Sequence, residues 1–381
     1  MPKSTKKQNK KPSKIRKIYL DVASGARGEE ANPSAIHELG VIEKNKLEQS
    51  RRTIADILDA RPDEIIFTGG ATESNNLAIL GMTKGHIVTT NIEHASVLET
   101  CKHVGSVTFV PVEKNGIVDP KKIKKAIRPD TVLVSVMYAN NEIGTIQPIR
   151  EIAKEIRHYR KNSTRSNLVK FPLFHTDATQ AVNYLPIRVE SLGVDMMSWN
   201  GAKIYGPKGV GALYVKRGTP IKPIMWGGEQ EGGLRPGTEN VTGIMALAQV
   251  MTETEKIKNK EVARVTKLRD YFISKLQKFN LVINGDLENR LPNNVNITIP
   301  KIPSDLLVIE LSARGVMASA KSACKSGDGK ASYVIEAINP NLKDTDGSLR
   351  FSLGRETTKK DIDDTIKALS EILKKLEKWY Y

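Results

Sequence analysis

Three short segments of the chain carry residue types that could do chemistry together. The first runs from Ile65 to Asn76 and combines a strand-like apolar run, a small-residue turn and a helix start. Free backbone N–H groups at such a turn converge on an anion with the positive end of the helix, and the Thr72 hydroxyl adds a donor. The segment predicts a phosphate-binding site; the alternative is an ordinary strand-to-helix turn that Thr72 caps.

The second segment places a carboxylate at the end of a strand. Asp177 follows an apolar run and precedes Gln180 in a predicted helix. In an open α/β sheet, ligands bind at the carboxyl ends of the strands, so we expect both side chains to point into the crevice. A carboxylate there could keep a pyridinium nitrogen protonated; the alternative is that Asp177 only caps a helix.

The third segment places Lys203 between a strand and a Gly/Pro turn. A lysine held near cationic or apolar groups loses its proton readily and can form a Schiff base with an aldehyde cofactor. Lys208 is the alternative, but its position between Pro207 and Gly209 suggests a solvated turn. A phosphate site, a pyridinium carboxylate and a Schiff-base lysine together match the needs of pyridoxal 5′-phosphate.

An α/β fold would position these residues. From Ile18 onward, short β-rich runs alternate with helical stretches, which predicts a mostly parallel sheet covered by helices. The expected strands are 18–22, 64–68, 86–90, 107–110, 131–137, 168–175, 195–199 and 211–215. The expected helices between them are 36–58, 74–80, 95–103, 122–127 and 149–159.

The pattern changes after the glycine-rich stretch 226–237. A long helical region at 241–278 precedes shorter elements at 294–299, 305–314 and 349–353 and a terminal helix at 359–378. This order predicts a smaller α+β domain. We therefore expect a basic disordered tail at 1–17, a large cofactor-binding α/β domain at 18–250 and a small C-terminal domain at 251–381.

Composition narrows the class of protein. The 381 residues are 39% hydrophobic and 27% charged, which suffices for a large core and excludes general disorder. Of the net charge of +16, residues 1–17 carry +8, so the charge by itself is weak evidence for a nucleic-acid partner. Two cysteines are too few for a disulfide framework or a cysteine-based zinc site, and no apolar run has membrane-spanning length. We expect a cytoplasmic protein with no metal and no membrane contact.

The sequence resembles the cysteine desulfurases, class V of the fold-type I pyridoxal-phosphate enzymes. The resemblance covers about residues 18–376 and rests on the motifs at 19–21, 70–77, 93–94, 140–144, 175–180, 203–209, 235–238, 322–324 and 350–355. It implies a fold-type I transferase with a large mixed, mostly parallel seven-stranded sheet domain and a smaller α+β C-terminal domain.

The resemblance also assigns cofactor contacts. Lys203 would bind pyridoxal 5′-phosphate covalently, Asp177 would pair with its ring nitrogen, and His94 would stack on the ring and help Lys203 to move protons. The other implied contacts are Gln180 and Asn140 near the phenolic oxygen, Ala71, Thr72 and Asn200 near the phosphate, and Thr238, which would reach the phosphate of the partner subunit in a homodimer.

Substrate binding and the nucleophile follow in the same way. Arg350 would bind the carboxylate of L-cysteine through two parallel hydrogen bonds, together with Asn140, and strand alternation lets Arg350 face a polar crevice. Arg355 is the nearby alternative. Cys324 lies in a small, polar, basic segment that favours a reactive thiolate, whereas Cys101 lies in a predicted helix and fits a buried packing role.

The chain departs from the family pattern in two places. Residues 22–31 replace an additional helix, and Asn200-Gly201-Ala202 replaces the usual Ser-Gly-His before the lysine. The first departure predicts a different wall at the entrance of the active site. The second predicts weaker retention of the cofactor, without loss of the reaction.

The expected reaction converts L-cysteine to L-alanine and leaves a persulfide on Cys324. An acceptor such as an iron–sulfur scaffold or a tRNA-thiolation enzyme would then take the sulfur. The alternatives are a selenocysteine lyase, another class V aminotransferase or lyase, and a basic nucleic-acid-binding scaffold with a vestigial cofactor site.

Overall fold

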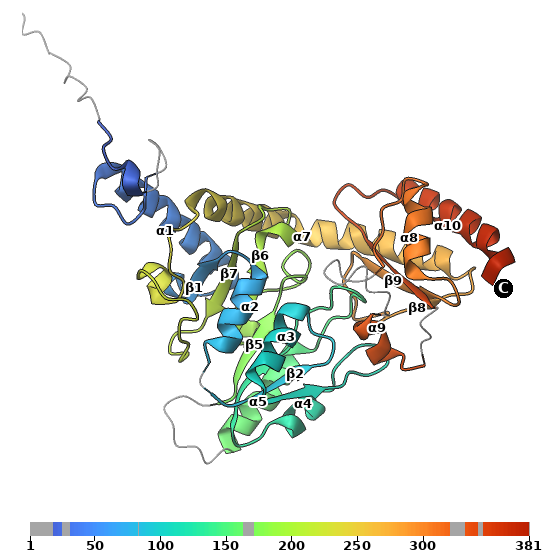
Figure 1. Ribbon diagram of the computed structural model, residues 1–381, viewed down its shortest axis with the longest axis horizontal. Helices are drawn as coiled ribbons and strands as arrows, with labels where there is room; N and C mark the ends of the chain where they lie inside the picture. Colours follow the sequence, from blue (N-terminus) through green and yellow to red (C-terminus); the bar gives the residue numbers. More distant parts are fainter. Residues whose placement is uncertain are drawn as a thin grey trace, which may run out of the picture.

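The computed structural model of the chain describes residues 18–24, 31–82, 84–162, 171–320, 332–341 and 346–380. The predicted tail at 1–17 lies outside these residues. The described chain forms a seven-stranded sheet and a three-stranded sheet, with one long helix, α7, running past both (Figure 1).

The large sheet has the strand order β1-β7-β6-β5-β4-β2-β3. Strand β7 is antiparallel to both of its neighbours, and the other neighbouring pairs are parallel, which confirms the predicted mixed, mostly parallel sheet. All residues of the central strands β4 and β5 are buried, as expected for strands that helices cover on both faces. The strands are β1 (Ile65–Thr68), β2 (His86–Thr90), β3 (Val107–Val110), β4 (Thr131–Ser135), β5 (Leu173–Asp177), β6 (Met196–Asn200) and β7 (Gly211–Val215).

The helices around this sheet begin and end close to the predicted positions. In α5, the buried residues Ile149, Ile152, Ala153 and Ile156 recur at spacings of three and four, which places one apolar face on the sheet. The helices are α1 (Glu38–Leu58), α2 (Ala71–Leu80), α3 (Ala95–Val104), α4 (Pro120–Ala126), α5 (Ile149–Asn162) and the short α6 (Val189–Leu192), which was not predicted.

The predicted strand at 18–22 is wrong. Residues 18–21 have no regular structure, and Val22–Ser24 forms a single 3-10 turn, η1. The alternating apolar residues that suggested a strand are Ile18, Leu20 and Val22, which are 70%, 91% and 63% exposed. No neighbouring strand in the described chain pairs with them, so their apolar side chains stay uncovered.

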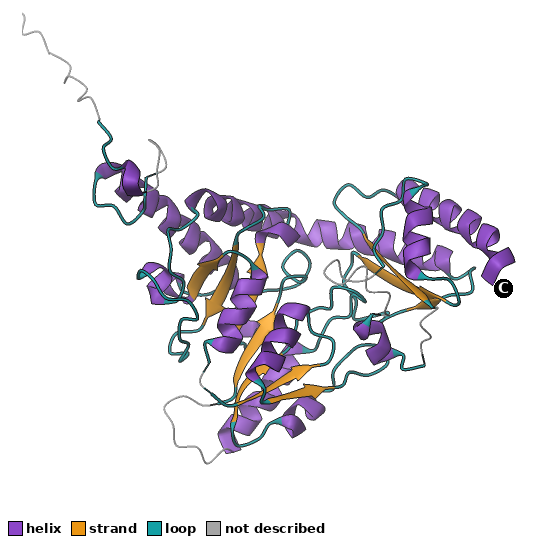
Figure 2. Cartoon of the chain, in the orientation of Figure 1, coloured by secondary structure: helices purple, strands orange, loops and turns teal. Residues whose placement is uncertain are grey.

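Helix α7 (Val241–Leu276) belongs to both hydrophobic cores. Residues up to Met251 pack with the large sheet, and residues from Val265 onward pack with the small sheet. Figure 2 shows the helix as one continuous element between the two sheets. The expected boundary between residues 250 and 251 falls inside this helix, and the division into domains stays a prediction.

The small sheet is antiparallel, with the order β10-β9-β8. Phe351 on β10 packs edge-on against Phe272 of α7, with ring centroids 5.0 Å apart, and this pair helps to attach the sheet to the long helix. The elements are β8 (Val282–Ile283), β9 (Asn294–Ile299), α8 (Ser304–Ser312), α9 (Tyr333–Ile338), β10 (Gly347–Ser352) and α10 (Lys359–Tyr380). The predicted elements of this region are confirmed; β8 and α9 are short and were not predicted.

Candidate active site

A cavity of about 430 Å³ lies where strands β5 and β6 end and β10 of the small sheet approaches them. It collects eight of the predicted site residues, although they are spread over most of the chain. These are Ala71, Thr72, His94, Asp177, Gln180, Asn200, Lys203 and Arg350.

One end of the cavity is the start of α2. The preceding residue, Gly70, gives this helix no side-chain cap, so the first N–H groups, at Ala71 and Thr72, receive no capping acceptor from it. The β7 backbone approaches this turn closely: a Cβ atom on Gly211 would lie 2.7 Å from the Cα of Gly70. Glycine at position 211 therefore lets the sheet support a helix start that is open to an anion.

Asp177 is the last residue of β5 and is held from two sides. Its Oδ2 accepts a hydrogen bond from Asn75 Nδ2 at 2.7 Å, and its Oδ1 accepts one from the backbone N–H of Thr179 at 2.9 Å. The residues after it form turns rather than the predicted α-helix, so Asp177 does not act as an α-helix cap. The Thr179 hydroxyl lines the same cavity and is buried without a hydrogen-bond partner.

Lys203 follows β6 in a single 3-10 turn, η3 (Gly201–Lys203). Its backbone N–H donates to Asn200 Oδ1 at 3.1 Å, and its carbonyl accepts from Asn183 Nδ2 at 2.7 Å. The backbone is therefore held, while the side chain lines the cavity and forms no ion pair with another described residue. Lys208, the alternative considered from the sequence, does not line the cavity.

His94 caps the N-terminus of α3 and lines the cavity. Its Nδ1 accepts the backbone N–H of Ser96 at 3.1 Å and lies 2.8 Å from the Ser96 hydroxyl oxygen. This histidine therefore caps a helix through Nδ1 and also lines the cavity.

Arg350 enters the cavity from β10. Its Nη1 donates to the carbonyl of Asn141 at 3.1 Å, while its Nε is buried without a hydrogen-bond partner. Burial lowers the pKa of Arg350, and the neighbouring charge of Glu142 opposes this only partly. A substrate carboxylate would supply both the missing acceptor and the missing negative charge.

Arg355, the alternative to Arg350, is engaged elsewhere. Its guanidinium lies over the ring of Tyr205, 4.2 Å from the centroid, and donates to Thr254 Oγ1 at 3.0 Å. Arg355 does not line the cavity, although Tyr205 does.

Two predicted residues are not brought into the cavity. Asn140 is fully buried: its Nδ2 donates to the carbonyl of Ile92, and its Oδ1 accepts the backbone N–H groups of Glu142 and Ile143. The structure thus uses Asn140 to shape a turn, and its neighbour Asn141 lines the cavity instead.

Thr238 lines a separate cavity of about 250 Å³, together with Ser24 and Asn32. This placement separates Thr238 from the other predicted cofactor contacts within one chain.

The two cysteines fall in different situations. Cys324 lies outside the described residues. Cys101 is fully buried in the core between α3 and the sheet, and burial raises the pKa of its thiol to about 12. Cys101 is therefore a packing residue, as predicted.

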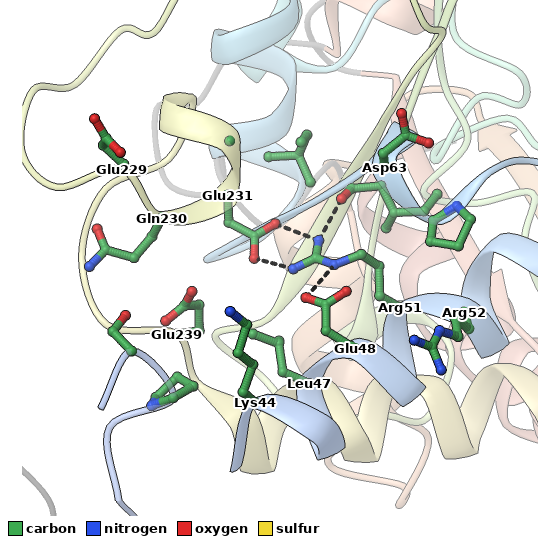
Figure 3. Close-up of a pocket in the computed structure, with 16 residues that line it drawn as sticks. Lys44, Leu47, Glu48, Arg51, Arg52, Asp63, Glu229, Gln230, Glu231 and Glu239 are labelled. Atoms are coloured by element: carbon green, nitrogen blue, oxygen red, sulfur yellow. Dashed lines mark hydrogen bonds and ion pairs between the residues drawn. The ribbon is translucent and has the colours of Figure 1, made fainter. Parts of the chain in front are cut away.

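A larger cavity, of about 810 Å³, contains none of the predicted site residues (Figure 3). Arg51 of α1 forms two hydrogen bonds with the buried carboxylate of Glu231, at 2.8 and 2.7 Å, and stacks over Phe67. Glu231 also accepts the backbone N–H of Phe67 at 2.8 Å. These charges compensate one another and hold α1, β1 and η4 (Gln230–Gly233) together, so the pair is structural.

The residues of the 430 Å³ cavity fit pyridoxal 5′-phosphate. The helix start at Ala71 suits a phosphate, Asp177 suits a pyridinium nitrogen, Lys203 suits an aldehyde, and the unpartnered Thr179 hydroxyl offers a further polar contact.

Comparison with known proteins agrees with this geometry. Residues 12–365 match the family model for class-V aminotransferases. A cysteine desulfurase IscS of Dictyoglomus turgidum is 44% identical over 91% of this chain and 88% of its own length. The chain belongs to the cysteine desulfurases. These enzymes depend on pyridoxal 5′-phosphate.

Solved structures place the whole fold in the same family. A NifS-like protein superimposes with a TM-score of 0.83 at 34% identity, covering 92% of this chain and 93% of that one. A structure described as SspA in complex with cysteine gives a TM-score of 0.71 at 34% identity, over 85% of this chain and 91% of that one. The fold and the family of this cysteine desulfurase are thereby confirmed.

Sequence reasoning missed several residues of the site. Asn75 and Ser96 connect Asp177 to His94, and Asn141, Asn183 and Tyr205 line the cavity. Asn75 lies inside the recognised motif at 70–77, and Ser96 stands two residues after His94, where a capping histidine meets its helix. The signal for these two was therefore present, but nothing in the sequence showed that the two segments touch.

Among the described residues, no group of three His, Cys, Asp or Glu side chains is placed to hold a metal ion. No described helix has both the length and the apolar character needed to span a membrane.

Proposed function

We propose that this protein takes sulfur from L-cysteine, releases L-alanine and carries the sulfur as a persulfide on Cys324. The observation that supports this most directly is the 430 Å³ cavity, which combines the lysine, the carboxylate and the histidine of the cofactor site with a substrate-binding arginine. In the overall step, L-cysteine and the enzyme thiol give L-alanine and the enzyme persulfide, so one C–S bond is lost and one S–S bond is formed.

When bound, pyridoxal 5′-phosphate supplies an electron-accepting ring that takes up the electrons left at Cα of the amino acid. Asp177 would hold the ring nitrogen protonated, and the open helix start at Ala71 and Thr72 would hold the phosphate. Gln180 and Asn200 line the same cavity and are proposed as further contacts.

Lys203 would take the proton from Cα, because its side chain reaches the cavity without another described partner. Arg350 would hold the substrate carboxylate at the opposite wall through its unpartnered Nε and its Nη groups. The two side chains come from different sheets, so the substrate would lie between the sheets.

The segment that carries Cys324 leaves from the edge of this cavity. Ser319 pairs with Arg350 on β10, and the Ser348 hydroxyl donates to the carbonyl of Ala320 at 3.1 Å. On the other side, the Ser332 hydroxyl donates to Glu142 Oε2 at 2.5 Å. In the sequence, Cys324 is four residues after Ala320 and eight residues before Ser332. This supports Cys324 as the thiol that attacks the substrate sulfur.

We also propose that the active enzyme is a homodimer. Thr238 lies apart from the cavity of its own chain, in a pocket shared with Ser24 and Asn32. Near these residues in the sequence, Leu20 and Ile36 are 91% and 97% exposed. These uncovered apolar side chains, close in sequence to Ser24 and Asn32, support contact with a second copy of the chain, and Thr238 would then bind the partner's phosphate.

The persulfide sulfur would pass to a second protein. A protein such as an iron–sulfur scaffold or a tRNA-thiolation enzyme would take it, in the cytoplasm.

The test is a purified-protein assay with L-cysteine and a reductant, reading alanine and sulfide together. We expect equal amounts of the two products without added keto acid. Lys203→Ala should abolish both, with Lys208→Ala as the matched control, and Cys324→Ala should abolish transfer to a protein acceptor, with Cys101→Ala as control. A requirement for a keto acid would favour an aminotransferase, and a strong preference for selenocysteine would favour a selenocysteine lyase.

A further inference from the structure

A continuous row of hydrogen bonds joins Asp177, which would pair with the ring nitrogen of the cofactor, to His94, which would stack on the ring. Asn75 Nδ2 donates to Asp177 Oδ2 at 2.7 Å and to the Ser96 hydroxyl oxygen at 2.8 Å. The Ser96 oxygen in turn lies 2.8 Å from His94 Nδ1. We call Asn75 and Ser96 the connecting pair.

The direction of each bond follows from the carboxylate. Because an ionised carboxylate only accepts hydrogen bonds, Asn75 must turn its amide nitrogen toward Asp177. The same nitrogen occupies an acceptor position on Ser96, so the Ser96 hydrogen is free to point at His94 Nδ1. The backbone N–H of Ser96 also donates to that nitrogen at 3.1 Å.

These bonds indicate which ring nitrogen of His94 carries the proton. Two donors face Nδ1, so this nitrogen carries no proton while both bonds are made, and neutral imidazole then carries its proton on Nε2. Nε2 has no hydrogen-bond partner among the described residues, and the ring lines the cavity.

The surroundings of Asn75 indicate a role besides stabilising the fold. It is fully buried, and its Oδ1 has no hydrogen-bond partner. A buried acceptor without a hydrogen bond lowers the stability of the folded state, so its presence indicates a functional role. Turning the amide over would place Oδ1 against the Asp177 carboxylate, which cannot donate to it, and would draw the Ser96 hydrogen away from His94. The unpartnered oxygen therefore belongs to the orientation that the row of bonds requires.

We propose that Asn75 and Ser96 are positioning residues that hold His94 as the Nε2–H tautomer and align it with Asp177. His94 then presents a donor, not a base, to the cavity, which leaves proton removal from Cα to Lys203. This inference rests on the proposed function only in treating His94, Asp177 and Lys203 as site residues.

The test uses the full-length holoenzyme with ¹⁵N-labelled histidine rings. Signals of His94 are assigned by their loss in His94→Gln. In the wild-type protein we expect unprotonated Nδ1 and protonated Nε2. Ser96→Ala and Asn75→Leu should each shift the Nδ1 signal and populate the second tautomer, whereas Ser96→Thr, which keeps the hydroxyl, should restore the wild-type spectrum.

Kinetics give an independent readout. Loss of one buried hydrogen bond in the row should lower kcat roughly tenfold, with little change in KM for L-cysteine. The matched control is Asn76→Leu, the adjacent amide, whose Nδ2 bonds to the carbonyl of Thr72 outside the row.

A wild-type His94 with its proton on Nδ1 would overturn the proposal, as would Ser96→Ala and Asn75→Leu spectra identical to those of the Asn76→Leu control. If Asn75→Leu does not fold, the comparison of Ser96→Ala with Ser96→Thr tests the proposal. The spectra do not depend on turnover, so an inactive wild-type protein with the expected tautomer would count against the proposed reaction and not against the positioning role.

Discussion

Both carboxyl oxygens of Glu93 lie 3.0 Å from the backbone nitrogen of Met137, whose N–H donates to them. The Thr90 hydroxyl also donates to Glu93, at 2.7 Å. Glu93 is fully buried directly before His94, and Met137 lines the cavity. A buried acid thus supports one wall of the site without touching it.

Glu93 should make the protein less stable as the pH rises. Burial raises the pKa of Glu93 from 4.5 to about 8. Between these values the unfolded chain loses this proton and the folded chain keeps it, so the free energy of unfolding falls with pH, by up to about 1.4 kcal/mol per unit. In Glu93→Gln this contribution disappears. Denaturant unfolding at pH 5 and pH 8 measures it; an equal change in both proteins would contradict the assignment.

His175 should have the opposite effect at lower pH. It lies between the hydroxyl oxygens of Ser135 and Ser198, at 2.9 and 2.8 Å, and burial lowers its pKa from 6.5 to about 4. Below pH 6.5, His175 takes up a proton in the unfolded chain but not in the folded chain. The free energy of unfolding therefore decreases as the pH falls toward 4. In His175→Gln the slope of stability between pH 6.5 and 4 should be smaller than in the wild type, although the variant itself is less stable.

Arg350→Lys should raise KM for L-cysteine by ~10- to 100-fold, because lysine cannot form two parallel bonds with a carboxylate. The matched control is Arg355→Lys, whose guanidinium contacts Tyr205 and Thr254 instead of the cavity. Steady-state kinetics over a range of L-cysteine concentrations distinguishes the two. An equal rise in KM for both variants would remove Arg350 from the substrate site.

Ala202→His should slow the loss of cofactor. Ala202 lines the cavity next to Lys203, at the position where the family usually has a histidine that helps to bind phosphate. Bound pyridoxal 5′-phosphate remaining after dialysis can be read from absorbance. The control is Ala212→Ser, a change in the core of β7 away from the cavity lining. No gain in retention by Ala202→His would show that the chain holds the phosphate without that histidine.

Thiol labelling should modify one cysteine of the native protein. Cys101 is buried and its thiol has a raised pKa, so a reagent that needs thiolate should not reach it. In Cys324→Ala, labelling should be absent until denaturant is added, and should then reach one thiol per chain. Rapid labelling of folded Cys324→Ala would contradict the packing role of Cys101.

Much of the fold could be predicted because the local patterns are strong. The strands β2, β3, β7 and β9 occupy the residues expected from runs of β-branched and apolar side chains. The strand expected at 18–22 failed for a physical reason: its alternating apolar residues have no pairing neighbour in the described chain. A local pattern shows which residues could pair, but not whether a second strand is present.

The site was predictable wherever a residue's role depends on its own segment. Asp177 and Lys203 follow from a strand end and a residue type, and Arg350 follows from strand alternation and the family resemblance. Asn140 was assigned to the cavity, yet its side chain bonds to its own turn and to the carbonyl of Ile92. Asn75 received no role, although it joins two segments 102 residues apart. Both outcomes depend on side-chain direction, which a sequence pattern leaves open.

Helix α7 also connects the two cores that support the site. From Met251, in the core of the large sheet, to Val265, in the core of the small one, the unbroken helix rises by ~21 Å. Lys203 follows a strand of the first sheet and Arg350 lies on a strand of the second, so a rigid helix connects the two cores that support these residues. The bond from Arg350 Nη1 to the Asn141 carbonyl joins the small sheet directly to the loop that follows β4 of the large one, so a motion that separates the amine-binding from the carboxylate-binding group would have to break this bond and bend the helix.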